Sequence, residues 1–369
     1  MTSAPTPASP LPPLAPPERQ PPNLDLPVVE RKAGYAVVGL GELALDEVLP
    51  AFGTARRSRC TALASGHREK ALRVAAAHGV RDDAVFGYDD FDARLRDRRD
   101  VDIVYLILPN SLHAEFAVRA LEAGKHVLCE KPMATSVAEC ERMIAAAAAA
   151  DRKLMVAYRL HHEPKTRRFA ELCRSGALGR IATIESSNVQ VTRPPNIRLS
   201  RTLGGGPVQD IGIYSINGCR MVTGEEPVSV QAVAHHPAAD PAFREVPESV
   251  SFLLRYPSGT IAHCTASFGG AESRRLRAHG TDGWIELDPA FAYRGLRLRR
   301  MRTAGGRGES AIEDVALNEV DQFAAEMDAF SASVLDGTPV TTPGELGLAD
   351  IRIVEAIERA IASGRSERL

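Results

Sequence analysis

The stretch Tyr35-Ala36-Val37-Val38-Gly39-Leu40-Gly41-Glu42-Leu43-Ala44 decides the fold of this 369-residue chain. It joins a short apolar run to two glycines, and a helical pattern of apolar residues follows as far as residue 52. In such a strand, turn and helix, Gly39 permits the tight turn and Gly41 lets a pyrophosphate approach the backbone. Ala44 allows the helix to pack closely on the strand. We therefore predict that Gly39, Leu40, Gly41 and Ala44 bind a dinucleotide, with its pyrophosphate at the helix N-terminus.

An alternation of short apolar runs with helical segments continues from this stretch to Tyr158. The further apolar runs lie at 60–64, 101–108 and 154–157, and Leu128-Cys129-Glu130 ends another buried strand. Strands that alternate with helices in this way are typical of a doubly wound parallel sheet. We predict an α/β fold that begins with a Rossmann domain over residues 31–158.

The end of the second strand bears on the choice between NAD and NADP. An NAD-selective domain usually has an acid about 20 residues beyond the glycines, where it binds the ribose 2′-hydroxyl. Here the strand ends at Ser65, and Arg68 and Lys70 follow it. A hydroxyl group with cations beside it suits a 2′-phosphate. We predict that the 31–158 domain binds NADP through Ser65, Arg68 and Lys70; the alternative is that both cations only cover an exposed helical turn.

Polar residues also follow the strand that ends at Leu108. In Pro109-Asn110-Ser111-Leu112-His113 the Asn110 amide is placed to bind a ribose hydroxyl or, alternatively, to cap a turn or helix. We assign Pro109, Asn110 and His113 to the cofactor site, with a structural contact as the alternative for His113. Tyr158 and Arg159 end a later strand at the same edge, and we expect them at the cofactor and substrate. Their alternative is a strand-end aromatic residue and a solvated arginine.

A lysine lies in an unusual place in Leu128-Cys129-Glu130-Lys131-Pro132. The proline fixes its own φ, removes a donor and biases Lys131 towards an extended backbone. A rigid lysine at the carboxyl edge of a parallel sheet lies where ligands of such sheets bind. From these residues alone, a site at Glu130 and Lys131 and a solvated lysine in a turn remain equally open.

The pattern changes after residue 159 to long strands with alternating apolar residues. They are predicted at 181–191, 228–235, 248–256, 260–268, 274–279 and 283–287. Runs of strands after a βαβ half indicate an α+β domain with a large, mostly antiparallel open sheet. We predict this substrate and oligomerisation domain over residues 159–369, with helices near 318–335 and 346–361. One face of its sheet is expected to carry helices and the other to meet a second subunit, as a homodimer or homotetramer.

A glycine-rich entry at 204–206 leads into a second chemical stretch of this domain. From Val208 the spacing is helical, and Asp210 and Tyr214 lie four residues apart on one face. An acid and a phenol placed in this way can orient a group and exchange a proton with it. The alternative is a capping aspartate and a core tyrosine.

The composition limits the classes of partner. A net charge of −2 gives no reason to expect nucleic acid or a membrane surface, and no apolar run approaches the length of a membrane span. The six cysteines are scattered, which fits buried small hydrophobes, and we expect no metal site. Residues 1–30 are rich in proline, alanine and serine, so they form either a disordered tail or an extended arm on a neighbouring subunit. No secretory or twin-arginine signal is found, and we expect a cytoplasmic protein.

Gly39-Leu40-Gly41, Glu130-Lys131-Pro132 and the segment 204–214 together resemble the glucose-fructose oxidoreductase / inositol dehydrogenase (Gfo/Idh/MocA) family. The resemblance runs from Tyr35 to the C-terminus. It is closest to the glucose-fructose oxidoreductase branch, also through residues 130–137 and Gly224-Glu225-Glu226-Pro227. Many relatives carry a histidine where this chain has Tyr214, which favours the tyrosine-using branch.

This resemblance implies an NADP-dependent oxidoreductase acting on the CH–OH group of a cyclic sugar or polyol. It implies Lys131 near the sugar hydroxyl and the nicotinamide, and Tyr214 as acid/base. Asp210 would hold Lys131 or a sugar hydroxyl. It also favours the arm over the tail for residues 1–30.

Two other functions remain open. One is a non-catalytic NADP-binding regulator or scaffold on the same fold, although such a protein would more readily have lost Lys131 or Tyr214. The other is a simple sugar dehydrogenase that releases its cofactor each cycle, in contrast to an oxidoreductase that retains it between two sugars.

Overall fold

The predicted dinucleotide stretch begins a six-stranded sheet in which every neighbouring pair of strands is parallel. The strand order is β3-β2-β1-β4-β5-β6. Its strands are β1 (Ala33–Val38), β2 (Ser58–Ala64), β3 (Val85–Phe86), β4 (Ile103–Leu106), β5 (His126–Glu130) and β6 (Leu154–Ala157). The doubly wound sheet is thereby confirmed, and the order reverses between β1 and β4, where such sheets bind ligands beyond the carboxyl ends of their strands.

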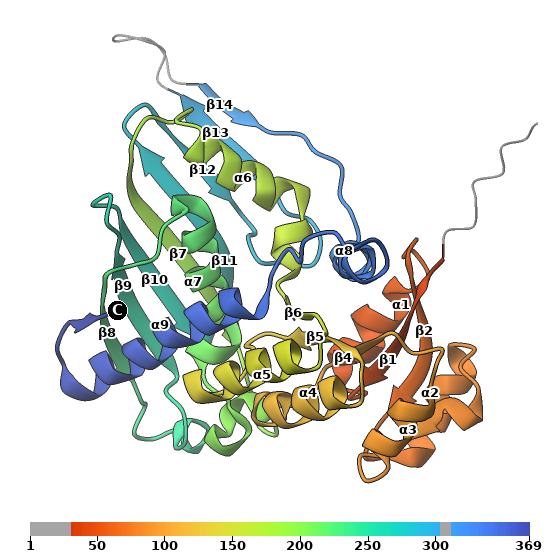
Figure 1. Ribbon diagram of the computed structural model, residues 1–369. Helices are drawn as coiled ribbons and strands as arrows, with labels where there is room; N and C mark the ends of the chain where they lie inside the picture. The colour runs from red at the N-terminus through yellow and green to blue at the C-terminus, as the bar shows by residue number, and fades with distance from the viewer. Residues whose placement is uncertain (1–30, 303–310) are drawn as a thin grey trace, which may run out of the picture. The chain divides into compact units, whose positions relative to one another are not determined.

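The computed structural model describes residues 31–302 and 311–369, and the described residues from Lys32 onward form one compact unit (Figure 1). The predicted arm or tail, residues 1–30, lies outside the described residues. In the described part, no helix has the length and apolar character needed to cross a membrane.

Helices connect the strands of this sheet. They are α1 (Leu49–Ala51), α2 (Arg68–Ala77), α3 (Phe91–Asp97), α4 (His113–Glu122) and α5 (Val137–Ala149), and a π-helical turn over Ala44–Val48 leads into α1. Ser136 caps α5 by accepting a hydrogen bond from the Glu139 backbone N–H, as the Ser-x-x-Glu pattern favours. All six residues of β1 are buried, as is typical of a parallel strand covered on both faces.

A nine-stranded sheet follows in the order β14-β13-β12-β11-β7-β10-β9-β8-β15, and only the β10–β7 pair is parallel. The predicted strands are found as β7 (Ile181–Val191), β8 (Ser229–His235), β9 (Ser249–Arg255), β10 (Ile261–Ser267), β11 (Gly269–Gly280) and β12 (Gly283–Leu287). The sequence did not predict β13 (Leu298–Arg302), β14 (Ala311–Asp314) or β15 (Glu367–Arg368). The arginines of β13 hide its strand character, and glutamates on the neighbouring strands neutralise them through the Arg299–Glu286 and Arg300–Glu313 ion pairs.

Helices α6 (Pro164–Arg174), α7 (Ile213–Thr223) and α9 (Gly344–Ser363) pack on one face of this sheet (Figure 1). The opposite face carries exposed and half-exposed side chains, including Val233 at 69% exposure. The fold class, a Rossmann sheet plus an α+β part with a large open sheet, is confirmed.

The helix α8 (Gln322–Asp336) belongs to the C-terminal half of the chain but packs against the first sheet. Its residues Phe323, Met327 and Phe330 form an apolar cluster with Tyr35 and Tyr105 of β1 and β4. The Tyr35 hydroxyl donates a 2.8 Å hydrogen bond to the Met327 carbonyl oxygen. The last part of the chain therefore fixes the underside of the sheet whose edge carries the predicted site.

Replacing Gly39 by alanine is expected to lower the free energy of unfolding by about 1–3 kcal/mol or more. Gly39 has φ +92°, and an added Cβ would lie 2.2 Å from the Ile107 carbonyl oxygen. Gly79→Ala is the matched control, because Gly79 also has positive φ but its Cβ would meet nothing within 4 Å. Urea unfolding curves measure both variants, and equal losses would contradict the steric explanation.

Candidate active site

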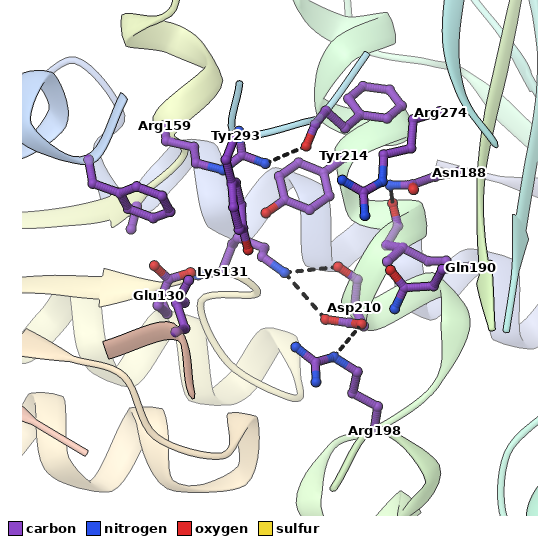
Figure 2. A pocket seen from close by; sticks show the side chains of 15 residues that line it. Glu130, Lys131, Arg159, Asn188, Gln190, Arg198, Asp210, Tyr214, Arg274 and Tyr293 are labelled. Carbon is purple, nitrogen blue, oxygen red and sulfur yellow. Dashed lines mark hydrogen bonds and ion pairs between the residues drawn. The ribbon is translucent and has the colours of Figure 1, made fainter. Parts of the chain in front are cut away.

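Two adjoining cavities lie at the carboxyl edge of the parallel sheet. The larger has a volume of about 1200 Å³ and begins at the glycine turn, and the smaller has a volume of about 120 Å³. Residues from the two sheets line both of them, including Glu130, Lys131, Arg198, Asp210 and Tyr293. Figure 2 shows these side chains pointing toward a common space.

The larger cavity has the shape that a dinucleotide needs at its glycine turn. Leu40 and Gly41 line it, and nothing lies within 4 Å of the point where a Gly41 Cβ would stand. This open approach to the backbone is what a pyrophosphate requires. Pro109 and Asn110 also line the cavity, and the Asn110 amide nitrogen donates to the Gly204 carbonyl oxygen at 2.8 Å.

Ser65 and Lys70 lie at the same end of this cavity, together with His67 and Tyr88, which the sequence analysis did not include. The Lys70 ammonium donates to the Leu40 carbonyl oxygen at 2.5 Å, so it is held beside the glycine turn. The Ser65 hydroxyl oxygen accepts a hydrogen bond from the His67 backbone N–H at 3.1 Å. These residues fit the adenosine end of a dinucleotide.

Four predicted cofactor residues do not line either cavity, namely Ala44, Arg68, His113 and Tyr158. Ala44 is buried, in accord with its expected packing role. The Arg68 guanidinium donates to the Val85 carbonyl oxygen, His113 lies buried between the Pro132 and Leu108 carbonyl oxygens, and Tyr158 is buried. Backbone carbonyl groups thus engage Arg68 and His113, and the contacts of His113 fit the structural alternative given for it.

Lys131 follows the last residue of β5 and extends across to the second stretch. Its ammonium donates to the Asp210 carbonyl oxygen at 2.9 Å and lies 3.5 Å from Asp210 Oδ1. It also lies 4.7 Å from the centre of the Tyr214 ring. Burial opposes the charge of Lys131, but the neighbouring Tyr214, Asp210 and Glu130 outweigh it and raise the pKa of Lys131. Lys131 is therefore a cation at neutral pH.

Asp210 joins Lys131 to a residue that the sequence analysis missed. Its Oδ2 accepts a 2.7 Å hydrogen bond from Arg198 Nε, while its Oδ1 faces Lys131. Asp210 lies in a π-helical turn, Val208–Gly212, that leads into α7, and both Asp210 and Tyr214 line the smaller cavity. The predicted shared face is therefore found, at the irregular beginning of the helix.

Tyr214 lies at the inner wall of the smaller cavity and is 9% exposed. Its ring stacks on Phe291 with 5.8 Å between the ring centres. Tyr293 lines the same cavity from the loop that follows β12, and Figure 2 shows it facing Tyr214. No spacing pattern in the sequence pointed to Tyr293, because a long loop brings it to the site.

Beneath Lys131 lies a buried pair of carboxyl groups. Tyr105 Oη is 2.9 Å from Glu130 Oε1 and 3.3 Å from Glu326 Oε1. One hydroxyl proton serves only one acceptor, so the three groups satisfy each other when Glu326 is a neutral acid that donates to Tyr105. Burial and the charge of Glu130 raise the pKa of Glu326 well above its ordinary value, and burial raises that of Glu130.

A cation, an acid and a phenol thus converge beside the larger cavity. Lys131 can stabilise an oxyanion, Tyr214 can exchange a proton, and Asp210 can orient both Lys131 and Arg198. Among the described residues, no group of three or more His, Cys, Asp or Glu side chains is placed to hold a metal ion.

Comparison with known proteins decides the family. Residues 33–158 match the model of the oxidoreductase family with an NAD-binding Rossmann fold (GFO_IDH_MocA), and residues 166–286 match the GFO/IDH/MocA C-terminal domain. This chain is a member of the GFO/IDH/MocA family. The predicted family and the prediction of an oxidoreductase are confirmed.

Several relatives of this family member act on sugars according to their names. A D-xylose 1-dehydrogenase [NADP(+)] of Haloarcula marismortui is 31% identical over 346 residues, which cover 91% of this chain and 92% of the relative. An aldose-aldose oxidoreductase from Caulobacter crescentus, solved with glycerol, is 42% identical with a TM-score of 0.87 and covers 92% of this chain and 100% of its own. A 3-ketoreductase from Actinomadura kijaniata, solved with TDP-benzene and NADP, is 29% identical with a TM-score of 0.79 and covers 90% of this chain and 98% of its own.

Glu326→Gln is expected to stabilise the protein increasingly as the pH rises above the ordinary pKa of a glutamate. The raised pKa means that the folded protein keeps the Glu326 proton, whereas the unfolded chain releases it near pH 4.3, so wild-type stability falls as the pH rises. The difference grows by up to about 1.4 kcal/mol per pH unit as long as the folded protein keeps the proton that the unfolded chain has released. Urea unfolding at several pH values measures it, with Glu122→Gln on the exposed side of α4 as control. Parallel curves for wild type and Glu326→Gln would contradict a neutral Glu326.

Proposed function

We propose that this GFO/IDH/MocA oxidoreductase transfers hydride between NADP and a hydroxyl-bearing carbon of a cyclic sugar or polyol. The observation that carries this proposal is the convergence of Lys131, Asp210 and Tyr214 on a cavity that continues into the one lined by Gly41. The NADP predicted from the sequence is the cofactor that the names of the xylose dehydrogenase and of the ketoreductase complex give.

The cofactor, when bound, supplies the nicotinamide carbon that accepts or donates hydride. Gly39, Leu40 and Gly41 would hold the pyrophosphate, and Ser65 and Lys70 the ribose phosphate end. Asn110 and Glu130 line the same cavity nearer the smaller one, where they would hold the ribose and nicotinamide parts.

The side chains of the smaller cavity would handle the proton of the sugar hydroxyl. Tyr214 accepts this proton when the sugar is oxidised and returns it when the sugar is reduced. The Lys131 ammonium stabilises the oxyanion that develops on the sugar oxygen, which is worth about 3–4 kcal/mol in comparable sites. Asp210 holds Lys131 in place by the contacts at 2.9 and 3.5 Å.

Two versions of this function differ in what happens to the cofactor. A simple dehydrogenase releases it in every cycle, whereas an oxidoreductase that couples two sugars retains it. The resemblance to the aldose-aldose oxidoreductase supports the second version, and that to the xylose dehydrogenase supports the first. Protein that carries NADP through gel filtration favours the second, and protein that elutes without it favours the first.

We further propose that two copies of the chain associate through the open face of the nine-stranded sheet. Opposed residues such as Gln231, Leu253 and His263 share this face, and apolar side chains stand among them. Leu253→Arg places a charge on this face and is expected to lower the oligomeric mass in light scattering. Val320→Arg, at an exposed position in the loop before α8, is the control. An unchanged mass for Leu253→Arg would contradict this interface.

A panel of aldoses, polyols, lactones and nucleotide-linked sugars, followed by NADPH absorbance, tests the reaction itself. We expect turnover with NADP to exceed turnover with NAD for at least one neutral sugar. A clear preference for NAD would contradict the cofactor assignment. Binding of NADP without turnover of any of these compounds would favour a regulator or scaffold.

Lys131→Met is expected to lower kcat by about 10²- to 10³-fold or more, while the Kd for NADP changes little. The reason is that the ammonium acts on the sugar oxyanion, whereas the dinucleotide is held mainly by the glycine turn. Steady-state kinetics and NADP titration by fluorescence measure the two effects. Arg142→Met serves as the control, because Arg142 is exposed on α5 and does not line the cavities. Substantial turnover in Lys131→Met would contradict the assigned role.

A further inference from the structure

A buried arginine lies behind the catalytic phenol. Arg159 is 3% exposed, and its guanidinium donates to the carbonyl oxygens of Phe291 at 2.6 Å and Ala292 at 3.1 Å. It also donates to the Gln322 side-chain oxygen. Buried charges are normally paired with an opposite charge, and among the described residues Glu130 is a carboxylate that interacts with Arg159, although no ion pair between the two is found within 4 Å.

Aromatic rings surround the Arg159 guanidinium. The guanidinium carbon is 5.2 Å from the centre of the Tyr214 ring, 4.5 Å from that of Tyr293 and 5.9 Å from that of Phe323. Two of these rings are phenols, which become anions when they lose a proton. Figure 2 shows Arg159 reaching behind Tyr293 to the side of Tyr214. An anion on Tyr214 would therefore be a natural counter-charge for this cation.

Lys131 is the other cation beside the Tyr214 ring, but its charge is not directed only at this phenol. Its ammonium is directed to the Asp210 carbonyl oxygen and carboxylate, and it lies over the face of the Tyr214 ring. The charge of Lys131 is thus partly matched by Asp210, whereas Arg159 donates its hydrogen bonds to neutral acceptors and interacts with the Glu130 carboxylate without a direct ion pair. Two cations, one from each side, border the same phenol.

We infer that Arg159 is a positioning residue of the acid–base step, whose charge stabilises the phenolate form of Tyr214 during proton transfer. This inference rests on the proposed function, in which Tyr214 exchanges the proton of the sugar hydroxyl. It assigns Arg159 a role through Tyr214, in place of the direct cofactor contact predicted from the sequence.

The other charged or titratable groups around this pair act in known directions. Glu130 and Glu326, on β5 and α8, oppose phenolate formation when they are ionised. Lys131 favours the phenolate, and Asp210 opposes it. Tyr293 competes with Tyr214 as a second phenol beside Arg159, and burial raises the pKa of Tyr293 to about 12, so Tyr293 stays neutral at physiological pH.

The pH dependence of kcat for sugar oxidation separates an electrostatic role from a structural one. Removing the cation in Arg159→Gln is expected to move the rising limb of kcat to higher pH by about one unit, which lowers kcat about tenfold on that limb. At higher pH the kcat of Arg159→Gln approaches that of the wild type, because the Tyr214 phenolate, once formed, accepts the proton in both proteins. Arg159→Lys keeps the charge and is expected to recover part of the shift. Equal loss at every pH would overturn the inference.

Gln322→Ala provides the matched control. Gln322 holds Arg159 and the carbonyl oxygens of Ala292 and Tyr293, so its removal loosens the same loop but keeps the cation. The rising limb of kcat against pH in Gln322→Ala is expected to stay within a few tenths of a pH unit of that in the wild type. A shift as large as that of Arg159→Gln would assign the effect to the loop and overturn the inference.

A titration that needs no substrate distinguishes failure of this inference from failure of the proposed function. The ultraviolet absorbance of tyrosinate is followed against pH in the wild type, Tyr214→Phe and Arg159→Gln. The phenolate signal lost in Tyr214→Phe is expected at higher pH in Arg159→Gln than in the wild type. The same midpoint in both would overturn the role of Arg159, whatever sugar the enzyme uses, and a wild type without sugar turnover would overturn only the proposed function.

Discussion

The contact between the Lys131 ammonium and Asp210 is the interaction on which the site depends. Lys131 leaves the carboxyl end of a strand of the parallel sheet, and Asp210 begins a helix that covers the antiparallel sheet. Both groups are largely removed from water, where a charge pair gains little net stability because desolvation offsets the attraction. The Lys131–Asp210 contact instead fixes the position of the lysine, beside Tyr214 and at the inner end of the larger cavity.

Buried charge is the recurrent feature around this contact. Arg198 adds a second cation to Asp210, Arg159 lies behind Tyr214, and Glu130 and Glu326 share the Tyr105 hydroxyl below. Such an arrangement costs stability that an apolar core would not cost. Active sites contain such buried charges despite the loss of stability, because the reaction needs charges held in fixed places with little water. The apolar residues of α8 pack against the underside of the sheet that carries these charges.

Sequence patterns predicted the secondary structure well wherever a hydrophobic periodicity or a glycine turn indicates a strand or a helix. The strand, turn and helix at Gly39 predicted the parallel sheet, and the alternating runs predicted β7 to β12. They did not predict β13, whose arginines are neutralised by residues of neighbouring strands. They also did not show that Arg68 and His113 contact backbone carbonyl oxygens, because a local pattern does not show which backbone carbonyl a side chain will meet.

The sequence by itself determined the dinucleotide turn, the order of the two sheets and the three residue types that carry the proposed chemistry. Each of these depends on contacts that are local in the chain or on motifs with fixed spacing. Only the tertiary structure decided that Lys131, Asp210 and Tyr214 meet, and that Arg198, Tyr293 and Glu326 join them. These partners lie between 12 and 221 residues from the groups they contact, and chain folding alone brings such distant residues together.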